Sequence, residues 1–121
     1  MSNGAEAVWI SNHGGRQLDQ AVATAYVVAG IRAAVGDDPH VYVDGGVRSG
    51  LHVLVALALG ATAAFVGRPL FHALAAGGED GVVRALRELG EELVEALRLT
   101  GSASLADTPG LIAGPPTPNG S

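Results

Sequence analysis

The 121-residue sequence contains no cysteine and no lysine: all seven of its basic residues are arginine. Without cysteine the chain can form no disulfide, no thiolate nucleophile and no zinc–thiolate site. Glycine is abundant, with 18 residues, about twice the usual share of roughly 7%. Hydrophobic residues make up 48% of the chain, enough for a core, which excludes an intrinsically disordered protein.

Positive charge and long hydrophobic segments are also scarce. The formal net charge is −5 and the isoelectric point is near 5.1, which argues against a nucleic-acid-binding protein. The most apolar stretch, residues 53–66, is shorter than a membrane span and is interrupted by Gly60. Residues 1–6 lack the basic start and the apolar run of a signal peptide. We therefore expect a cytoplasmic protein that has neither a membrane nor a nucleic acid as its partner.

Strand and helix patterns alternate along the chain. Three short apolar runs, each leading into a polar loop that contains glycine, are typical of buried parallel strands: residues 7–10, 41–43 and 63–66. Helical patterns follow each run: residues 24–35 with Thr24 as N-cap and Gly36 as stop, residues 50–59 with Ser49 as N-cap, and residues 82–97.

This order predicts an α/β fold made of consecutive βα units with a parallel sheet. Three units are too few for a (β/α)8 TIM barrel, which needs eight units and about 250 residues. The sequence therefore indicates a partial barrel of about three βα units, and a small open three-stranded sheet is the alternative. We expect residues 1–114 to belong to this domain and the proline-rich residues 115–121 to be a disordered tail.

The loop after the first predicted strand carries His13 and Arg16, separated by two glycines. Imidazole titrates near neutrality, so His13 is a candidate base. The Arg16 guanidinium can hold a carboxylate through two parallel hydrogen bonds. The alternative is a polar turn with a capping histidine.

The loops after the second and third strands point to a phosphate. Residues 44–50 combine glycines, a helix N-terminus and Arg48, which together favour phosphate binding, although they do not have the Walker sequence. The alternative to a phosphate-binding loop is an ordinary glycine-rich turn. If these strands are the last two of a barrel, Arg48 and Arg68 meet at one dianion, because the corresponding barrel loops often share a phosphate. No pair of histidines has metal-ligand spacing, so we predict no metal site.

Four sequence motifs occur in the following order: Ser11–Asp19 (SNHGGRQLD), Val43–Gly50 (VDGGVRSG), Ala58–Ala61 (ALGA) and Val66–Pro69 (VGRP). The order closely resembles the C-terminal part of the FMN-dependent 2-hydroxy acid oxidases and dehydrogenases, the family of glycolate oxidase and lactate oxidase, over residues 5–105. SNHGGRQLD is the most specific motif, because the Asp-Gly-Gly and Gly-Arg elements recur in other phosphate-binding barrels such as IMP dehydrogenase.

The resemblance implies the last three βα units of a TIM barrel, FMN as cofactor, and oxidation of a small 2-hydroxy acid to a 2-oxo acid. It implies that His13 is the catalytic base and also contacts the substrate, whose carboxylate Arg16 binds. The positions that match the family's cofactor-binding residues are Ser11, Asp44, Gly45, Gly46, Val47, Arg48, Gly67 and Arg68.

One departure from the family concerns lysine. The family places a lysine on an earlier strand, where its charge stabilises the reduced flavin, and this chain has none. We therefore expect little or no turnover from the chain alone. The alternative function is a non-catalytic flavin- or phosphate-binding half-barrel, and in either case we expect a homo-oligomer or association with the complementary part of a barrel. A relative of IMP dehydrogenase is a further alternative, against which the missing cysteine and the intact His-Gly-Gly-Arg run both argue.

Overall fold

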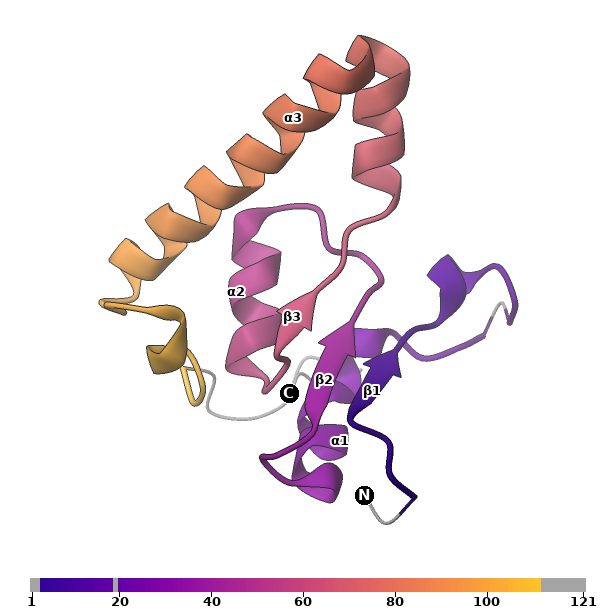
Figure 1. The fold of residues 1–121 in the computed structure, drawn as a ribbon, viewed down its shortest axis with the longest axis vertical. Coiled ribbons are helices and arrows are strands. Elements are labelled where there is room, and N and C mark those ends of the chain that lie inside the picture. Colours follow the sequence, from indigo (N-terminus) through magenta and orange to yellow (C-terminus); the bar gives the residue numbers. More distant parts are fainter. Residues whose placement is uncertain (1–2, 19, 112–121) are drawn as a thin grey trace.

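The computed structural model describes residues 3–18 and 20–111, which form a three-stranded parallel sheet with helices on one face (Figure 1). The strands are β1 (Ala7–Ile10), β2 (His40–Val43) and β3 (Ala63–Ala64), in the order β1-β2-β3. Trp9 pairs with Tyr42 in the register. The α/β class and a parallel sheet of three strands at the predicted places in the sequence are confirmed.

Strand β3 is shorter than the predicted 63–66. Its partner β2 ends at Val43, where the chain turns into the glycines after Asp44. Phe65 still donates its N–H to the Val43 carbonyl at 2.8 Å, but residues beyond it have no neighbouring strand to pair with. The ladder therefore stops where the partner strand leaves the sheet.

Helices α1 (Val28–Val35) and α2 (Gly50–Ala58) connect the strands. Gly36, at φ 81°, ends α1 as predicted, and the Ser49 hydroxyl caps α2 by accepting the His52 N–H. The prediction that Thr24 is an N-cap was wrong. Thr24 starts a separate 3₁₀ turn, and its hydroxyl donates to the Asp44 carbonyl. This hydrogen bond ties Thr24 to the loop after β2, and α1 begins only at Val28.

Helix α3 (Arg68–Leu99) is twice as long as the predicted helix over 82–97. Its earlier part begins directly after Gly67, and Gly78 at φ 60° bends the helix sharply, as Figure 1 shows. The part beyond the bend carries the apolar stripe seen in the sequence, and its residues Glu92 and Leu93 pack against Gly50 of α2. The predicted tail, residues 115–121, lies outside the described residues.

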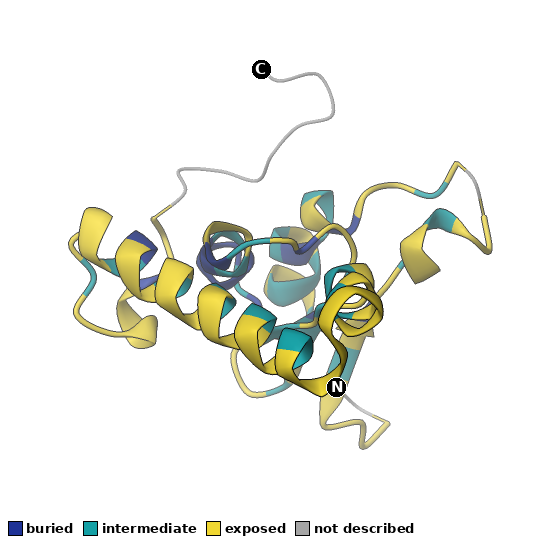
Figure 2. Ribbon diagram, turned by 90° about the horizontal axis from the view of Figure 1, so that it is seen from above, coloured by how far each residue is buried: buried dark blue, intermediate teal, exposed yellow. Residues whose placement is uncertain are grey.

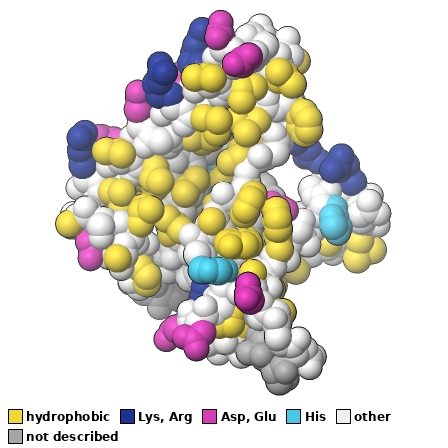
Figure 3. All heavy atoms as spheres, in the orientation of Figure 1, with side chains coloured by type: hydrophobic (Ala, Val, Ile, Leu, Met, Phe, Trp, Pro, Cys, Tyr) yellow, Lys and Arg dark blue, Asp and Glu magenta, His cyan; other side chains and the backbone are white. Residues whose placement is uncertain are grey.

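The core lies between one face of the sheet and the helices α1 and α2, and Figure 2 shows α3 exposed along most of its length. Apolar side chains also gather over the strands and along α3 on the side shown in Figure 3. None of the helices within the described ranges is long and apolar enough to cross a membrane. The buried core residues are Ile10, Val28, Val41, Val43, Ala56, Leu59 and Ala61.

The half-buried Arg32 ties together the chain segments at the amino edge of the sheet. Its Nε donates to the Gly60 carbonyl at 2.8 Å, and its Nη1 donates to the carbonyls of Gly36 and Pro39, both at 2.8 Å. Its Nη2 donates to the Thr62 hydroxyl at 3.1 Å. One side chain thus joins the end of α1 to the segments that lead into β2 and β3.

Arg32→Met is expected to lower the free energy of unfolding by about 2 kcal/mol, because partly buried carbonyls lose a charged donor. Chemical denaturation monitored by circular dichroism measures the loss. Arg98→Met is the matched control: Arg98 makes one exposed ion pair, with Glu95, and its loss is expected to cost under about 0.5 kcal/mol. Equal effects of the two substitutions would contradict a bracing role for Arg32.

Candidate functional site

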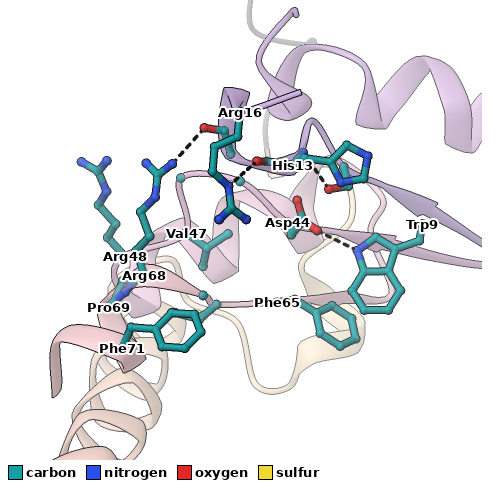
Figure 4. Close-up of a pocket in the computed structure, with 16 residues that line it drawn as sticks. Trp9, His13, Arg16, Asp44, Val47, Arg48, Phe65, Arg68, Pro69 and Phe71 are labelled. Atoms are coloured by element: carbon teal, nitrogen blue, oxygen red, sulfur yellow. Dashed lines mark hydrogen bonds between the residues drawn. The ribbon is translucent and has the colours of Figure 1, made fainter. Parts of the chain in front are cut away.

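A pocket of about 440 Å³ lies at the carboxyl edge of the sheet, where the three loops after the strands meet. All ten residues predicted to form a site line this one pocket, although they come from three separate parts of the sequence. Figure 4 shows the pocket and labels its larger side chains. Its lining residues are Trp9, Ser11, His13, Gly14, Arg16, Asp44, Gly45, Gly46, Val47, Arg48, Phe65, Val66, Gly67, Arg68, Pro69 and Phe71.

The first loop is a tight turn with a left-handed backbone. His13, Gly14 and Gly15 have φ values of 54°, 65° and 80°, and a left-handed histidine is strained. Side chains of the preceding residues hold the turn: the Ser11 hydroxyl accepts the His13 N–H, and the Asn12 side chain accepts the Gly14 N–H, both at 3.1 Å. These hydrogen bonds hold the strained turn, and the turn places the His13 imidazole at the pocket.

Two arginines brace this turn through its carbonyls. Arg16 donates from Nε to the His13 carbonyl at 3.2 Å, which leaves its outer guanidinium nitrogens available to a ligand. Arg68, at the start of α3, donates to the Gly14 carbonyl at 3.0 Å. A Cβ on Gly14 would lie 2.9 Å from the Arg68 Nη2, so glycine permits this approach. The third post-strand loop is thereby tied to the first.

The second loop turns on two glycines. Gly45 and Gly46 have φ values of 95° and 74°, which side chains rarely adopt. A Cβ on Gly45 would also approach the Thr24 hydroxyl to 3.0 Å. The Asp44 carboxylate accepts a hydrogen bond from the Trp9 indole at 3.0 Å. This loop thus presents backbone, the Asp44 carboxylate and the Arg48 guanidinium to the pocket.

The two helix N-termini beside the pocket differ. At α2, the Gly50 N–H donates to the Glu92 carboxylate at 2.7 Å and the Arg48 N–H donates to the His52 Nδ1 at 3.1 Å. These partners make α2 a poorer anion site than the sequence predicted. At α3, Gly67 provides no side-chain cap and the first turn contains no acidic residue. Pro69 has no N–H, and Leu70 and Phe71 donate to the Gly67 carbonyl, so the α3 terminus can offer an anion its dipole and the Arg68 N–H.

The pocket has an excess of positive charge. Arg16, Arg48 and Arg68 line it, against the single carboxylate of Asp44. Figure 4 shows the side chains of Arg48 and Arg68 extending in the same direction. Such a site suits an anion with more than one charge. Within the described ranges, no group of three or more histidine and acidic side chains is placed to hold a metal ion.

Sequence reasoning missed the aromatic side of the pocket. The ring of Trp9 lies 4.3 Å from that of Phe65, centroid to centroid, and Phe71 also lines the pocket. Only the alternation along β1 hinted at this, since buried Ile10 puts its neighbour Trp9 on the opposite face. Flat apolar rings beside a cationic region suit a ligand with both a planar and an anionic part.

Comparison with known proteins identifies the family. The family model for FMN-dependent dehydrogenase matches residues 1–113. The chain belongs to the FMN-dependent dehydrogenase family. It is 52% identical to the 4-hydroxymandelate oxidase of Amycolatopsis orientalis over 102 residues, which cover 84% of this chain and 29% of that protein. It is 49% identical to glycolate oxidase 1 of Zea mays, over 88% of this chain and 29% of the relative.

Solved structures agree with the family assignment. A mandelate oxidase with benzoyl-formic acid superposes with a TM-score of 0.86 at 50% identity, covering 88% of this chain and 32% of that one. A mandelate oxidase mutant with a monooxide FMN adduct superposes with a TM-score of 0.85. The chain therefore spans about a third of the length of the relatives it matches.

Proposed function

We propose that this chain forms the phosphate-binding and carboxylate-binding part of an FMN-dependent enzyme that oxidises a small 2-hydroxy acid to a 2-oxo acid. In this proposal it supplies the last three βα units of a (β/α)8 barrel. The observation that carries the proposal is the meeting of three post-strand loops at one pocket, where three guanidinium groups face one carboxylate. The family membership supports FMN as the cofactor.

The residues of the pocket fit FMN. Arg48 and Arg68, with the N-terminus of α3 and the backbone at Gly46, would hold the phosphate. Asp44 would accept a hydrogen bond from a hydroxyl of the ribityl chain. The other cofactor contacts, by resemblance, would come from Ser11, Gly45, Val47 and Gly67.

His13 and Arg16 would handle the substrate. The Arg16 guanidinium is held at Nε by the His13 carbonyl, so its two outer nitrogens can bind both oxygens of a carboxylate. This orients the hydroxyl-bearing carbon toward the imidazole, and a ring nitrogen of His13 takes up a proton as the substrate is oxidised. When bound, FMN would accept the two electrons and the second proton.

A comparison of FMN with riboflavin, which lacks the phosphate, tests the proposal. FMN is expected to bind the chain at least about 100-fold more tightly in calorimetric titration, because the phosphate adds charge-assisted hydrogen bonds worth about 1.5–3 kcal/mol each. Raising the ionic strength should weaken FMN binding and leave riboflavin binding nearly unchanged. Equal affinities for the two ligands would overturn the proposal.

The 121 residues alone are expected to oxidise 2-hydroxy acids at least about 100-fold more slowly than a complete family member. The chain has no lysine to stabilise an anionic reduced ring, and such electrostatic stabilisation contributes a factor of about 10²–10³. An oxygen-consumption assay with added FMN and a panel of 2-hydroxy acids measures the rate. Turnover at the rate of a complete family member would contradict this expectation.

The non-catalytic half-barrel is not favoured, since the relatives are named as oxidases and dehydrogenases. Association with a second copy or with a complementary part of the barrel stays a prediction. So does the cytoplasmic location.

A further inference from the structure

Trp9, the single tryptophan of the chain, lies in the pocket although no sequence motif marks it. Its indole Nε1–H donates to the Asp44 Oδ2 at 3.0 Å, across 35 positions of sequence. Its ring is tilted by 32° over Phe65 and meets the edge of Tyr42 at 6.1 Å between centroids. The side chain is nevertheless 55% exposed, so these contacts rather than burial hold it in place.

The partner of this hydrogen bond is unexpected on electrostatic grounds. Asp44 is the one carboxylate in a pocket that also contains three guanidinium groups. A carboxylate and a guanidinium that come within reach of each other form hydrogen bonds roughly twice as strong as those between neutral groups. Within the described part of the chain, Asp44 forms no ion pair with Arg16, Arg48 or Arg68, and its carboxylate is bound by a neutral donor.

We propose that Trp9 is a positioning residue that holds the Asp44 carboxylate away from the arginines of the pocket. This has two consequences for the proposed function, on which the inference rests. The guanidinium groups are not engaged by the Asp44 carboxylate and stay available to the anionic parts of cofactor and substrate. The Asp44 Oδ1, which accepts no hydrogen bond from the described residues, stays free for a hydroxyl of the cofactor. Removal of the indole N–H releases Asp44 to pair with an arginine and weakens FMN binding.

A double-mutant cycle on FMN affinity tests this, using Trp9→Phe and Asp44→Asn singly and together. Phenylalanine keeps a ring over Phe65 but loses the N–H. Trp9→Phe is expected to weaken FMN binding about 10- to 100-fold when Asp44 is present, the loss of one hydrogen bond to a charged group. In the Asp44→Asn background the same substitution should change the affinity less than about 2-fold. An equal loss in both backgrounds would show that Trp9 acts through its ring alone and would overturn the proposal.

Tyr42→Phe is the matched control, because it removes a polar group from the same aromatic cluster without touching Asp44. A second readout needs no FMN. The only indole N–H resonance of the chain is expected to move in Asp44→Asn by several-fold more than in Tyr42→Phe, as recorded by ¹⁵N–¹H correlation spectra. An unmoved resonance in Asp44→Asn would overturn the proposed role of Trp9 in positioning Asp44. A wild-type chain that binds no FMN would count against the proposed function alone.

Discussion

FMN binding by an Arg48→Met, Arg68→Met double variant is expected to be about 1,000-fold weaker than binding by the wild-type chain. Each guanidinium lines the pocket and is proposed to hold the phosphate, and a hydrogen bond to a charged group contributes about 1.5–3 kcal/mol. Two such losses give about 4 kcal/mol, which corresponds to about 10³ in affinity. Riboflavin binding should change less than about 3-fold. Calorimetric titration of each ligand provides the measurement.

The matched control is Arg84→Met, Arg87→Met, which removes the same two charges from exposed positions of α3 outside the pocket. It should lower FMN affinity less than about 3-fold, since distant exposed charges are screened by salt. If the control variant weakened FMN binding as much as the pocket variant does, the loss of affinity would come from the change in net charge. A loss of riboflavin binding equal to that of FMN would place the arginines elsewhere than at the phosphate.

Gly50→Ala is expected to destabilise the fold by about 3 kcal/mol. Gly50 is the first residue of α2 and is buried against α3. A Cβ there would collide with the Leu93 backbone nitrogen and lie 2.6 Å from the Glu92 carbonyl carbon, and backbone cannot turn aside as a side chain can. The helices would have to separate, and the Gly50–Glu92 hydrogen bond would be lost with them. Denaturant unfolding followed by circular dichroism measures the change.

Gly90→Ala is the control for this substitution. Gly90 lies in α3, and a methyl group added to it would meet nothing within 4 Å. Alanine is also the better helix former by about 1 kcal/mol. The substitution should therefore stabilise the chain or leave it unchanged. A Gly50→Ala variant as stable as the wild type would mean that α2 and α3 do not pack as closely as described.

The strands and their loops could be predicted because the information is local. Ile10, Val41 and Val43 lie in short apolar runs, and the glycines that follow them force turns. Parallel strands end at the same edge of a sheet, so loops far apart in sequence were expected to meet. The ten predicted site residues do line one pocket. Their individual chemical roles remain proposals.

Other features depend on partners distant in sequence. Thr24 has the local signature of an N-cap, but its hydroxyl donates to the Asp44 carbonyl, twenty residues away. The open α2 terminus that the motif suggested is closed by Glu92 from α3. Neither partner leaves a mark in the neighbouring sequence.

By itself, the sequence determined the α/β class, the order of βα units, and which loops carry the imidazole and the guanidinium groups, because hydrophobic periodicity and glycine act within a few residues. Only the tertiary structure decided which of those charges remain free. Arg16 and Arg68 brace the first loop, and Asp44 is bound by Trp9 rather than by an arginine. Such pairings are set by the geometry of neighbouring strands and helices, where a neutral donor 35 residues away can lie closer to a carboxylate than any cation does.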